Sequence, residues 1–307
     1  TKWVALLGAG AKNFPALEED EGGKAVIVLD MKDGSLEKEI IHNDLGSVVA
    51  PLSVEAGPRP MRIRKFYLGD DQGAIFEGDL SSYDKSEWGL GKVFAPGESV
   101  PESGLFTIPY AVEVGMIKNR KWLFWGTGDP DWLFGEREGQ CYVFGMNRSL
   151  SGSTSFTLGD LPELVNIAED QYDDSVAVSA NGWRLSLGEG EMVSTPAVLY
   201  RGYIFFATYT PKTDPCAVGD SSFYIMKADT GLGGFVTYTG DEITSWKKSI
   251  TLEATRISGI TVTGGKVYVG VTAFSNASDP KKALEDFTGN ISVSGNLLVF
   301  DVPRNVM

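Results

Sequence analysis

The sequence predicts an all-β protein, and more narrowly a β-propeller of four-stranded antiparallel blades. The main observation is a repeated pattern, in which an apolar strand and a glycine-rich turn lead into a second strand that closes on or near Asp. The pattern returns at intervals of roughly 40–60 residues, which is typical of propeller repeats. The composition agrees, because 37 Gly, 16 Phe and 11 Tyr among 307 residues suit many short strands joined by tight turns.

The first two groups of strands show the pattern plainly. The apolar run at 25–30 ends in the turn at 32–34, and the run at 65–69 passes through Asp70, Asp71 and Gly73 into a second strand at 74–80. Asp accepts hydrogen bonds from amides two residues further on, and Gly adopts positive φ at no steric cost. We therefore interpret the two Asp residues as caps of the turn.

The third and fifth groups repeat the same arrangement. The third joins 121–128 to 140–146, and the fifth joins 265–271 to 296–302. Within the third group, Trp122 and Trp125 are three positions apart in one strand, so their side chains point to opposite faces of the sheet. At most one of them can face any one surface, and the other is expected in the core.

The fourth group contains the most informative stretch, residues 181–231, which we interpret as one blade with an insertion. A Thr-Pro-Ala-Val-Leu strand is followed by the turn Arg201-Gly202 and a strand at 203–209. A cysteine-bearing loop and a strand ending in Asp229-Thr230-Gly231 complete the stretch. Asp and Gly at these offsets favour a tight reversal of the chain.

The whole chain is expected to form a single propeller domain over residues 1–307, with about five blades. The strand groups span about 3–42, 46–95, 105–150, 181–239 and 246–303. Propellers close with roughly 4–8 blades. Two alternatives remain open: a ring of five or six blades, or an incomplete ring whose missing blades come from another chain.

Net charge restricts the partners. The chain carries 27 basic and 41 acidic residues and a net charge of −14. Nucleic-acid binding depends on Lys and Arg at phosphates, so the charge argues against it, and against an anionic membrane surface too. No run approaches the ~20 apolar residues of a membrane span. No signal peptide is present, and the chain opens within a strand, so we expect a mature product or a domain of a longer protein.

The two cysteines, Cys141 and Cys216, lie in neighbouring strand groups. One alternative is a disulfide, which would close a loop of about 75 residues and stabilise the fold by at most ~4 kcal/mol. The other is two buried thiols, and the sequence does not decide between them. Two cysteines in an acidic, Gly-rich β chain favour an exported, oxidising location.

Four segments together resemble a known family. They are residues 3–13 with 25–30, the strand Phe66-Tyr67-Leu68-Gly69-Asp70 with Gly73, the strand 124–128, and the 181–231 block. The block includes Gly182-Trp183, Thr195-Pro196, Asp214-Pro215-Cys216 and the closing Asp-Thr-Gly. In this order they are similar to the C-terminal propeller of the PilY-type proteins, which act at the cell surface in type IV pilus biogenesis and adhesion.

The resemblance implies an extracellular protein on or near the pilus, beside pilins or minor pilins, without catalytic activity. It also implies that this chain is the C-terminal portion of the family's propeller. Members of the family often carry an EF-hand-like calcium loop before the strand that matches 66–70. Here that segment, Val54–Arg64, offers one carboxylate and three arginines. Calcium needs 6–8 oxygen ligands, so the site is not transferred and no cofactor is expected.

Few residues remain as candidate sites, and we expect no catalytic and no cofactor-binding residue. Asp129 and Asp131 flank a proline and offer two oxygens to a cation, although a proline turn with solvated carboxylates is the favoured interpretation. Any binding is expected on rim loops, since loops carry most binding residues. The long loops are 13–24, 128–139, 160–181, 211–221 and 275–290.

The main hypothesis is a non-enzymatic, pilus-associated surface protein that acts in pilus assembly or adhesion. It would use its rim loops and contacts with a partner chain, and a host or surface receptor is a further partner. One alternative is a quinoprotein-type dehydrogenase, which needs a Glu-Asn-Asp metal site and, in many members, adjacent cysteines. Another is a glycan-binding propeller that uses some of the seven tryptophans.

Overall fold

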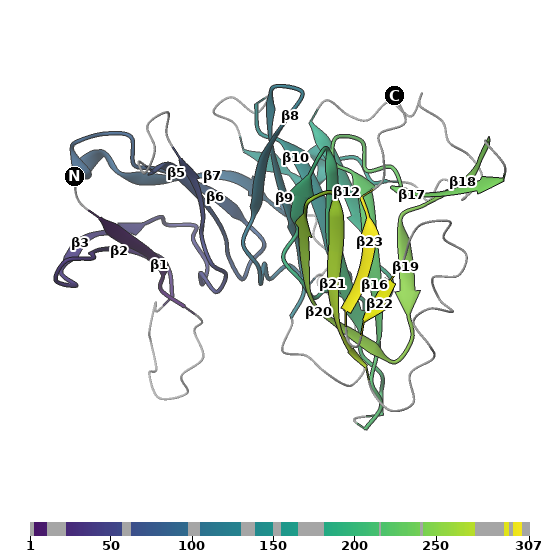
Figure 1. Cartoon of the computed structure of the whole chain (residues 1–307). Coiled ribbons are helices and arrows are strands. Elements are labelled where there is room, and N and C mark those ends of the chain that lie inside the picture. Colours follow the sequence, from purple (N-terminus) through teal and green to yellow (C-terminus); the bar gives the residue numbers. More distant parts are fainter. Residues whose placement is uncertain are drawn as a thin grey trace.

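The computed structural model of the chain confirms the all-β prediction and has a β-propeller-like fold (Figure 1). It describes residues 3–10, 23–56, 63–97, 105–129, 139–149, 155–164, 181–214, 216–239, 242–273, 292–294 and 297–302. These residues form strands in several antiparallel sheets, with two short 3₁₀ helices. Within these ranges there is no helix that is both long and apolar enough to span a membrane.

The first two sheets occupy the N-terminal third of the chain. The first has the order β1 (Val4–Gly8), β2 (Ala25–Asp30) and β3 (Leu36–Ile41). The second runs β4 (Ser53–Ala56), β5 (Ile63–Gly69), β6 (Ile75–Asp79) and β7 (Gly89–Ala95), with β11 (Phe156–Thr157) parallel to β7. The 3₁₀ helix η1 (Lys85–Glu87) comes just before β7 in the sequence, and η2 (Leu158–Asp160) comes just after β11.

The third and fourth sheets form the middle of the molecule. The third contains β8 (Glu113–Ile117), β9 (Arg120–Gly126), β10 (Tyr142–Asn147) and β12 (Gly182–Ser186). The fourth contains β13 (Met192–Val193), β15 (Tyr203–Thr210), β16 (Asp220–Lys227) and β19 (Ser249–Leu252), with β14 (Val198–Tyr200) also paired to β15.

The C-terminal part adds a fifth large sheet and a separate hairpin. The fifth sheet has the order β20 (Thr255–Thr263), β21 (Lys266–Ala273), β23 (Leu297–Asp301) and β22 (Ser292–Ser294). The hairpin β17 (Phe235–Thr239) and β18 (Glu242–Lys247) makes a two-stranded sheet of its own. In Figure 1 it projects from the body on the side of the C-terminus.

Two expected group boundaries are wrong. The sequence pattern predicts residues 182–186 at the start of the fourth group, but as β12 they pair with β10 and complete the third sheet. The physical reason is the register Gly145↔Trp183, because the missing side chain of Gly145 leaves room for the indole ring. Similarly β19, expected in the fifth group, pairs with β16 in the fourth sheet.

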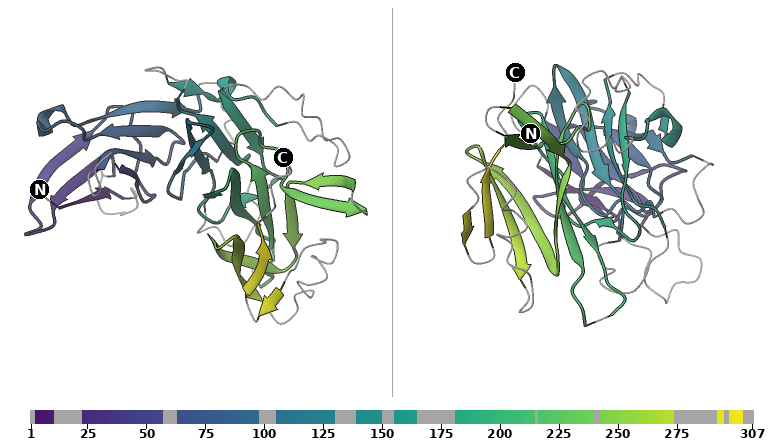
Figure 2. Two further views of the ribbon diagram at one scale, coloured as in Figure 1. Left: turned by 45° about the horizontal axis from the view of Figure 1, so that its top comes forward. Right: turned by 90° about the vertical axis from the view of Figure 1, so that its right-hand side faces the viewer.

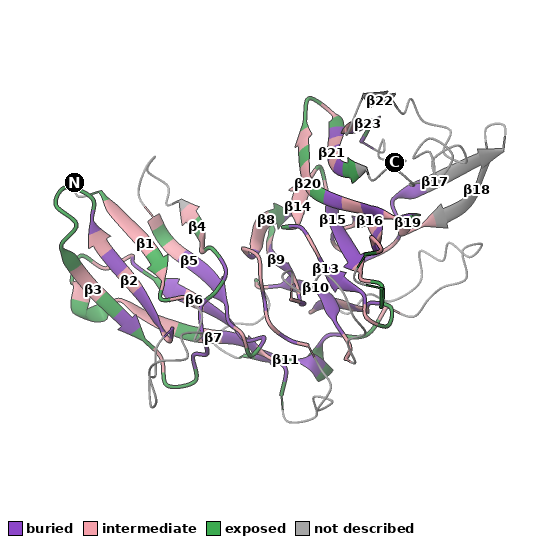
Figure 3. Cartoon of the chain, turned by 90° about the horizontal axis from the view of Figure 1, so that it is seen from below, coloured by how far each residue is buried: buried purple, intermediate pink, exposed green. Residues whose placement is uncertain are grey.

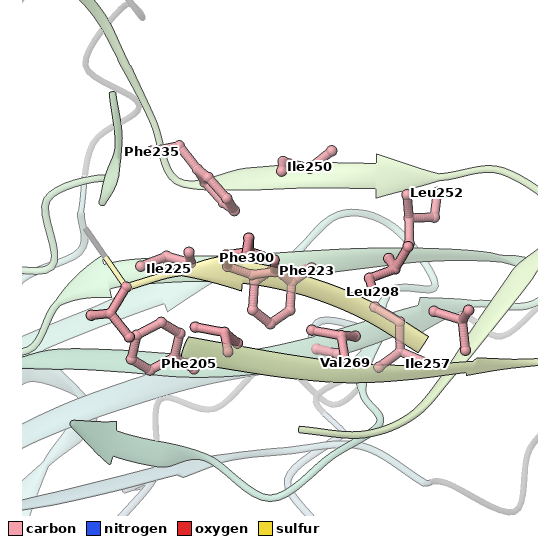
Figure 4. Close-up of a cluster of buried hydrophobic side chains, with 14 of the residues drawn as sticks. Phe205, Phe223, Ile225, Phe235, Ile250, Leu252, Ile257, Val269, Leu298 and Phe300 are labelled. Carbon is pink, nitrogen blue, oxygen red and sulfur yellow. The ribbon is translucent and has the colours of Figure 1, made fainter. Parts of the chain in front are cut away.

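The five large sheets stack face to face along an arc, with the N-terminal sheet at one end and the C-terminal sheet at the other (Figure 2, left). Edge strands of the second to fifth sheets also meet, since β4 contacts β8, β8 contacts β14 and β14 contacts β20. Four apolar layers fill the spaces between neighbouring sheets. Figure 4 shows the last of these layers, with Phe205 and Phe223 of the fourth sheet against Val269 and Phe300 of the fifth.

The expected turns are present and fix the hairpins. Arg201 and Gly202 have φ of 50° and 81° and join β14 to β15, as a type I′ turn requires. The Gly231 amide donates to the Lys227 carbonyl at 2.7 Å, which closes the turn after β16. Asp70 is fully buried and its carboxylate accepts from the amides of Gln72 and Ala74, which confirms its capping role, whereas Asp71 accepts from the distant Ser47 amide at 2.7 Å instead.

Candidate functional site

Only one of the two candidate cation ligands lies among the residues that the structure describes. Asp129 is half-buried just beyond β9, whereas Asp131 lies outside the described residues. Among the residues that the structure describes, no group of three or more His, Cys, Asp or Glu side chains is arranged to hold a metal ion. Most of the long rim loops, including 13–22, 130–138, 165–180 and 274–291, also lie outside the described ranges.

The disulfide considered between Cys141 and Cys216 is not formed in this structure, where both residues are thiols. Cys141 is 1% exposed in the apolar layer between the third and fourth sheets. Cys216 is exposed in the turn between β15 and β16, where its amide donates to Asp214 at 2.9 Å. The alternative of two buried thiols is therefore correct for Cys141 only.

Of the tryptophans considered for sugar stacking, Trp122 and Trp125 are core residues, whereas Trp3 is 59% exposed and Trp132 lies outside the described residues. Trp122 and Trp125 lie on opposite faces of β9, as predicted, but each packs into a different apolar layer and both are buried. The segment compared with a calcium loop begins as strand β4, and residues 57–62 lie outside the described residues. Its one carboxylate, Glu55, accepts from Lys121 Nζ at 2.6 Å.

A charged pocket lies between the second and third sheets, at a place that the sequence analysis did not select. The apolar layer between these sheets gives way to charged side chains where β9 begins and β10 ends. The pocket has a volume of about 240 Å³ and is lined by Lys65, Glu77, Lys121, Arg148 and Ser149. A second hollow of about 350 Å³ shares Glu77 and Arg148 with it.

Glu77 of β6 is the centre of this pocket. Its carboxylate accepts from Lys65 Nζ at 2.5 Å, from the Tyr67 hydroxyl at 2.8 Å and from Arg148 Nε at 3.1 Å. Lys65 and Tyr67 belong to β5, whereas Arg148 follows β10, so the carboxylate joins the second sheet to the third. Lys121 enters the same pocket from β9.

The surroundings shift the ionisation of these groups in opposite directions. Burial by itself raises the pKa of Glu77, but the hydrogen bonds from Lys65, Tyr67 and Arg148 outweigh it and lower the pKa below the usual range. Burial, followed by the negative charge of Glu77, raises the pKa of the Tyr67 hydroxyl. At neutral pH the network therefore contains a carboxylate and a neutral phenol that donates to it.

The pocket is suited to an anionic group. Lys65, Lys121 and Arg148 bring three positive charges against the two carboxylates of Glu55 and Glu77, which is a local excess of one in a chain of net charge −14. Arg and Lys are the usual donors to carboxylate, phosphate and sulfate oxygens. The sequence contains one indication of this pocket. Glu77 is a charged residue on the same face of β6 as the apolar Ile75, two positions earlier.

No protein-family model matches the sequence. No curated protein matches it either. Among solved structures, the chain is similar to the "Pseudomonas aeruginosa PilY1 C-terminal domain", with a TM-score of 0.60 and 15% identity. The match covers 90% of this chain and 66% of that one, so the chain spans about two thirds of the PilY1 domain.

Two further structures carry no argument, because their TM-scores are low. They are BBS1N in complex with ARL6DN, at a TM-score of 0.31 and 8% identity, and the computationally designed Ika8 protein, at 0.24 and 8%. The first covers 93% of this chain and 74% of the other, and the second 91% of each. The comparisons therefore support a PilY1-like propeller fold for this chain.

Proposed function

We propose that this chain is a non-enzymatic surface protein associated with type IV pili, acting in pilus assembly or adhesion. The observation that carries the proposal is the similarity of fold to the PilY1 C-terminal domain over 90% of the chain. The resemblance of the ordered sequence segments to the PilY-type family led to the same hypothesis, although no family model matches the sequence. An exported, extracellular location and contacts with pilins or another partner chain belong to the same proposal.

A gene deletion with complementation tests the proposal. Loss of the gene is expected to reduce the number of surface pili, or the adhesion of piliated cells, and the wild-type gene should restore both. A destabilised variant with a disrupted core provides the control for loss of fold. Normal piliation and adhesion in the deletion strain would contradict the proposal.

The enzymatic alternative makes a different prediction. A quinoprotein-type dehydrogenase would reduce an artificial electron acceptor when the purified chain is supplied with pyrroloquinoline quinone, calcium and an alcohol or aldose. The pilus proposal predicts no dye reduction above that of heat-denatured chain. Reduction that depends on both quinone and calcium would favour the enzyme.

The charged pocket supports one narrower second candidate, which is binding of an anionic glycan. The excess of one positive charge around the 240 Å³ pocket, from three cations against Glu55 and Glu77, favours a sugar with a carboxylate or sulfate over a neutral sugar. Arg148→Ala and Lys121→Ala should each weaken such binding, whereas Lys266→Ala, which removes an exposed pair with Asp301 away from both hollows, should not. Equal binding of charged and neutral glycans would contradict this candidate.

A further inference from the structure

Two glycines open the second hollow beside the charged pocket. In the register of the second sheet, Gly91 of β7 lies opposite Glu77 of β6, and Gly89 lies opposite Asp79. Residues directly opposite each other share one face of a sheet, so both glycines are on the face that Glu77 presents to the third sheet. A Cβ atom added to Gly89 would meet no atom within 4 Å, and one added to Gly91 would meet only the Glu77 carbonyl oxygen, at 4.0 Å. The backbone of β7 can therefore be approached closely here.

The burial of β7 agrees with this arrangement. Figure 3 shows the change along the strand, from half-buried and exposed residues at its start to buried residues near its end. The buried end belongs to the apolar layer between the second and third sheets, which contains Val93 and Phe94. The open start of β7 lines the second hollow, which has a volume of about 350 Å³.

The charged pocket forms the positive side of the cleft that the two hollows make. The hollows share Glu77 and Arg148, whose side chains pair at 3.1 Å. The charged residues that line only the first hollow are Lys65 and Lys121. Glu55, which pairs with Lys121, compensates one of these charges. The described lining of the first hollow therefore keeps an excess of positive charge.

The second hollow forms the negative side. The charged residues that line it alone are Asp79, Glu87 and Lys92. Lys92 Nζ donates to the Asp44 carboxylate at 2.6 Å, so its charge is compensated. Burial raises the pKa of Asp79, but hydrogen bonds from Ser81 outweigh burial and lower the pKa below its usual range. Two carboxylates against one paired lysine give the described lining of this hollow an excess of negative charge.

The polarity of the lining favours a sugar over a peptide. Every described residue around the first hollow is polar or charged, and the apolar side chains that the second hollow adds are Leu90 and Val93. Peptide recognition depends mainly on apolar grooves and on free sheet edges, whereas this lining consists mostly of ammonium, guanidinium and carboxylate groups. Such groups suit a ligand that is rich in hydroxyl groups. The volume of about 350 Å³ is also within the range of roughly 300–1,000 Å³ that is usual for small-molecule pockets.

The charge of the whole chain favours a ligand that is neutral overall. A net charge of −14 repels a polyanion at long range. A sugar with one acidic group and one ammonium group has no net charge, and it can place each group against charges of the opposite sign. The separation of charge along the cleft therefore selects such a sugar over one that is only anionic.

We propose that the two hollows are one binding cleft for a zwitterionic sugar, which carries an acidic group and a free amino group. The acidic group lies beside Lys65 and Lys121, the ring lies against Gly89 and Gly91, and the ammonium group faces Glu87. This inference rests on the anionic-glycan candidate above, and it adds the second hollow and the amino group of the ligand to it.

Isothermal titration calorimetry with four sugars of one ring type tests the inference. They are glucosamine 6-sulfate, N-acetylglucosamine 6-sulfate, glucosamine and glucose, so that the sulfate and the ammonium group are varied separately. Glucosamine 6-sulfate should bind tightest, about 2- to 5-fold more tightly than its N-acetyl form, as expected for one exposed ion pair. The difference should diminish in 1 M NaCl, where the screening length is about 3 Å.

Two variants locate the sugar in the cleft. Glu87→Gln should abolish the preference for the free amine, whereas Glu189→Gln, an exposed carboxylate that lines neither hollow, should retain it. Gly91→Leu places a side chain in the second hollow and should weaken the binding of both sulfated sugars by about 10-fold. Circular dichroism of each variant checks that it is folded.

The outcomes separate this inference from the candidate on which it rests. Equal affinities for the two sulfated sugars, both above glucose, would overturn the zwitterionic ligand and keep the anionic glycan. Equal affinities for all four sugars would overturn both. Full binding by folded Gly91→Leu would exclude the second hollow and so refute the inference. Tighter binding of an Asp-Lys dipeptide with blocked ends than of glucosamine 6-sulfate would replace the sugar by a peptide.

Discussion

The pairing of Gly145 with Trp183 gives the sharpest test of the fold, because it assigns β12 to the third sheet. A Cβ atom added to Gly145 would lie 2.4 Å from the nearest ring atom of Trp183. The indole cannot move easily, since it is fully buried and donates from Nε1 to the Ala228 carbonyl at 2.9 Å. Gly145→Ala should therefore destabilise the protein by about 1–3 kcal/mol, as overpacking does.

The double variant distinguishes this contact from a general effect on the strand. Trp183→Ala alone should cost about 3–5 kcal/mol, as expected for a buried tryptophan. In the Gly145→Ala/Trp183→Ala variant the added methyl group enters the space left by the ring. The two costs should then fall short of additivity by about 1–3 kcal/mol.

Urea unfolding followed by circular dichroism measures these free energies. The milder Trp183→Leu replaces Trp183→Ala if the latter does not fold, and Gly91→Ala is a matched control because an added Cβ there meets only one atom, at 4.0 Å. Additive costs for Gly145→Ala and Trp183→Ala would refute the contact. The assignment of residues 182–186 to the third sheet would then fail with it.

Three further predictions concern charged groups and thiols. Glu77→Gln should lower the free energy of unfolding at neutral pH by about 1–3 kcal/mol. Because the pKa of Glu77 is lowered in the folded state, this loss is complete above the ordinary value of 4.5. It disappears as the pH falls through the folded-state pKa of Glu77. Equal losses at pH 7 and pH 3 would contradict the ion network. Asp70→Asn should cost about 1–3 kcal/mol in thermal unfolding, because an amide cannot accept from the Gly46 amide at 2.9 Å and from the Gln72 amide as well. Ellman's reagent should titrate one thiol, that of Cys216, in the native protein and two after unfolding, whereas none in either state would indicate a disulfide.

Much of the strand architecture was predictable because it depends on local chemistry. The apolar run at 25–30 coincides with β2, and the turns at Arg201-Gly202 and after Lys227 were readable from Gly and Asp. Such turns require particular backbone angles, and few residue types adopt them. The same local rules predicted the capping role of Asp70.

What failed depends on contacts between residues far apart in the sequence. Strand β12 joins β10 across a long connection, and nothing local to 182–186 indicates which sheet it completes. The same holds for the pocket, where Glu77 and Arg148 meet although 71 positions separate them. The disulfide between Cys141 and Cys216 was considered because the two residues lie in neighbouring strand groups. In the structure Cys141 is buried in an apolar layer and Cys216 is exposed in a distant turn, so the two thiols do not pair.

The central claim, that this protein is associated with type IV pili, is tested most directly by quantitative mass spectrometry of pili sheared from the native cells. The chain should be present in the sheared fraction at a fixed ratio to pilin. In a strain that lacks the major pilin, the chain should disappear from that fraction while a control outer-surface protein remains. Equal amounts of the chain with and without pilin would contradict the account.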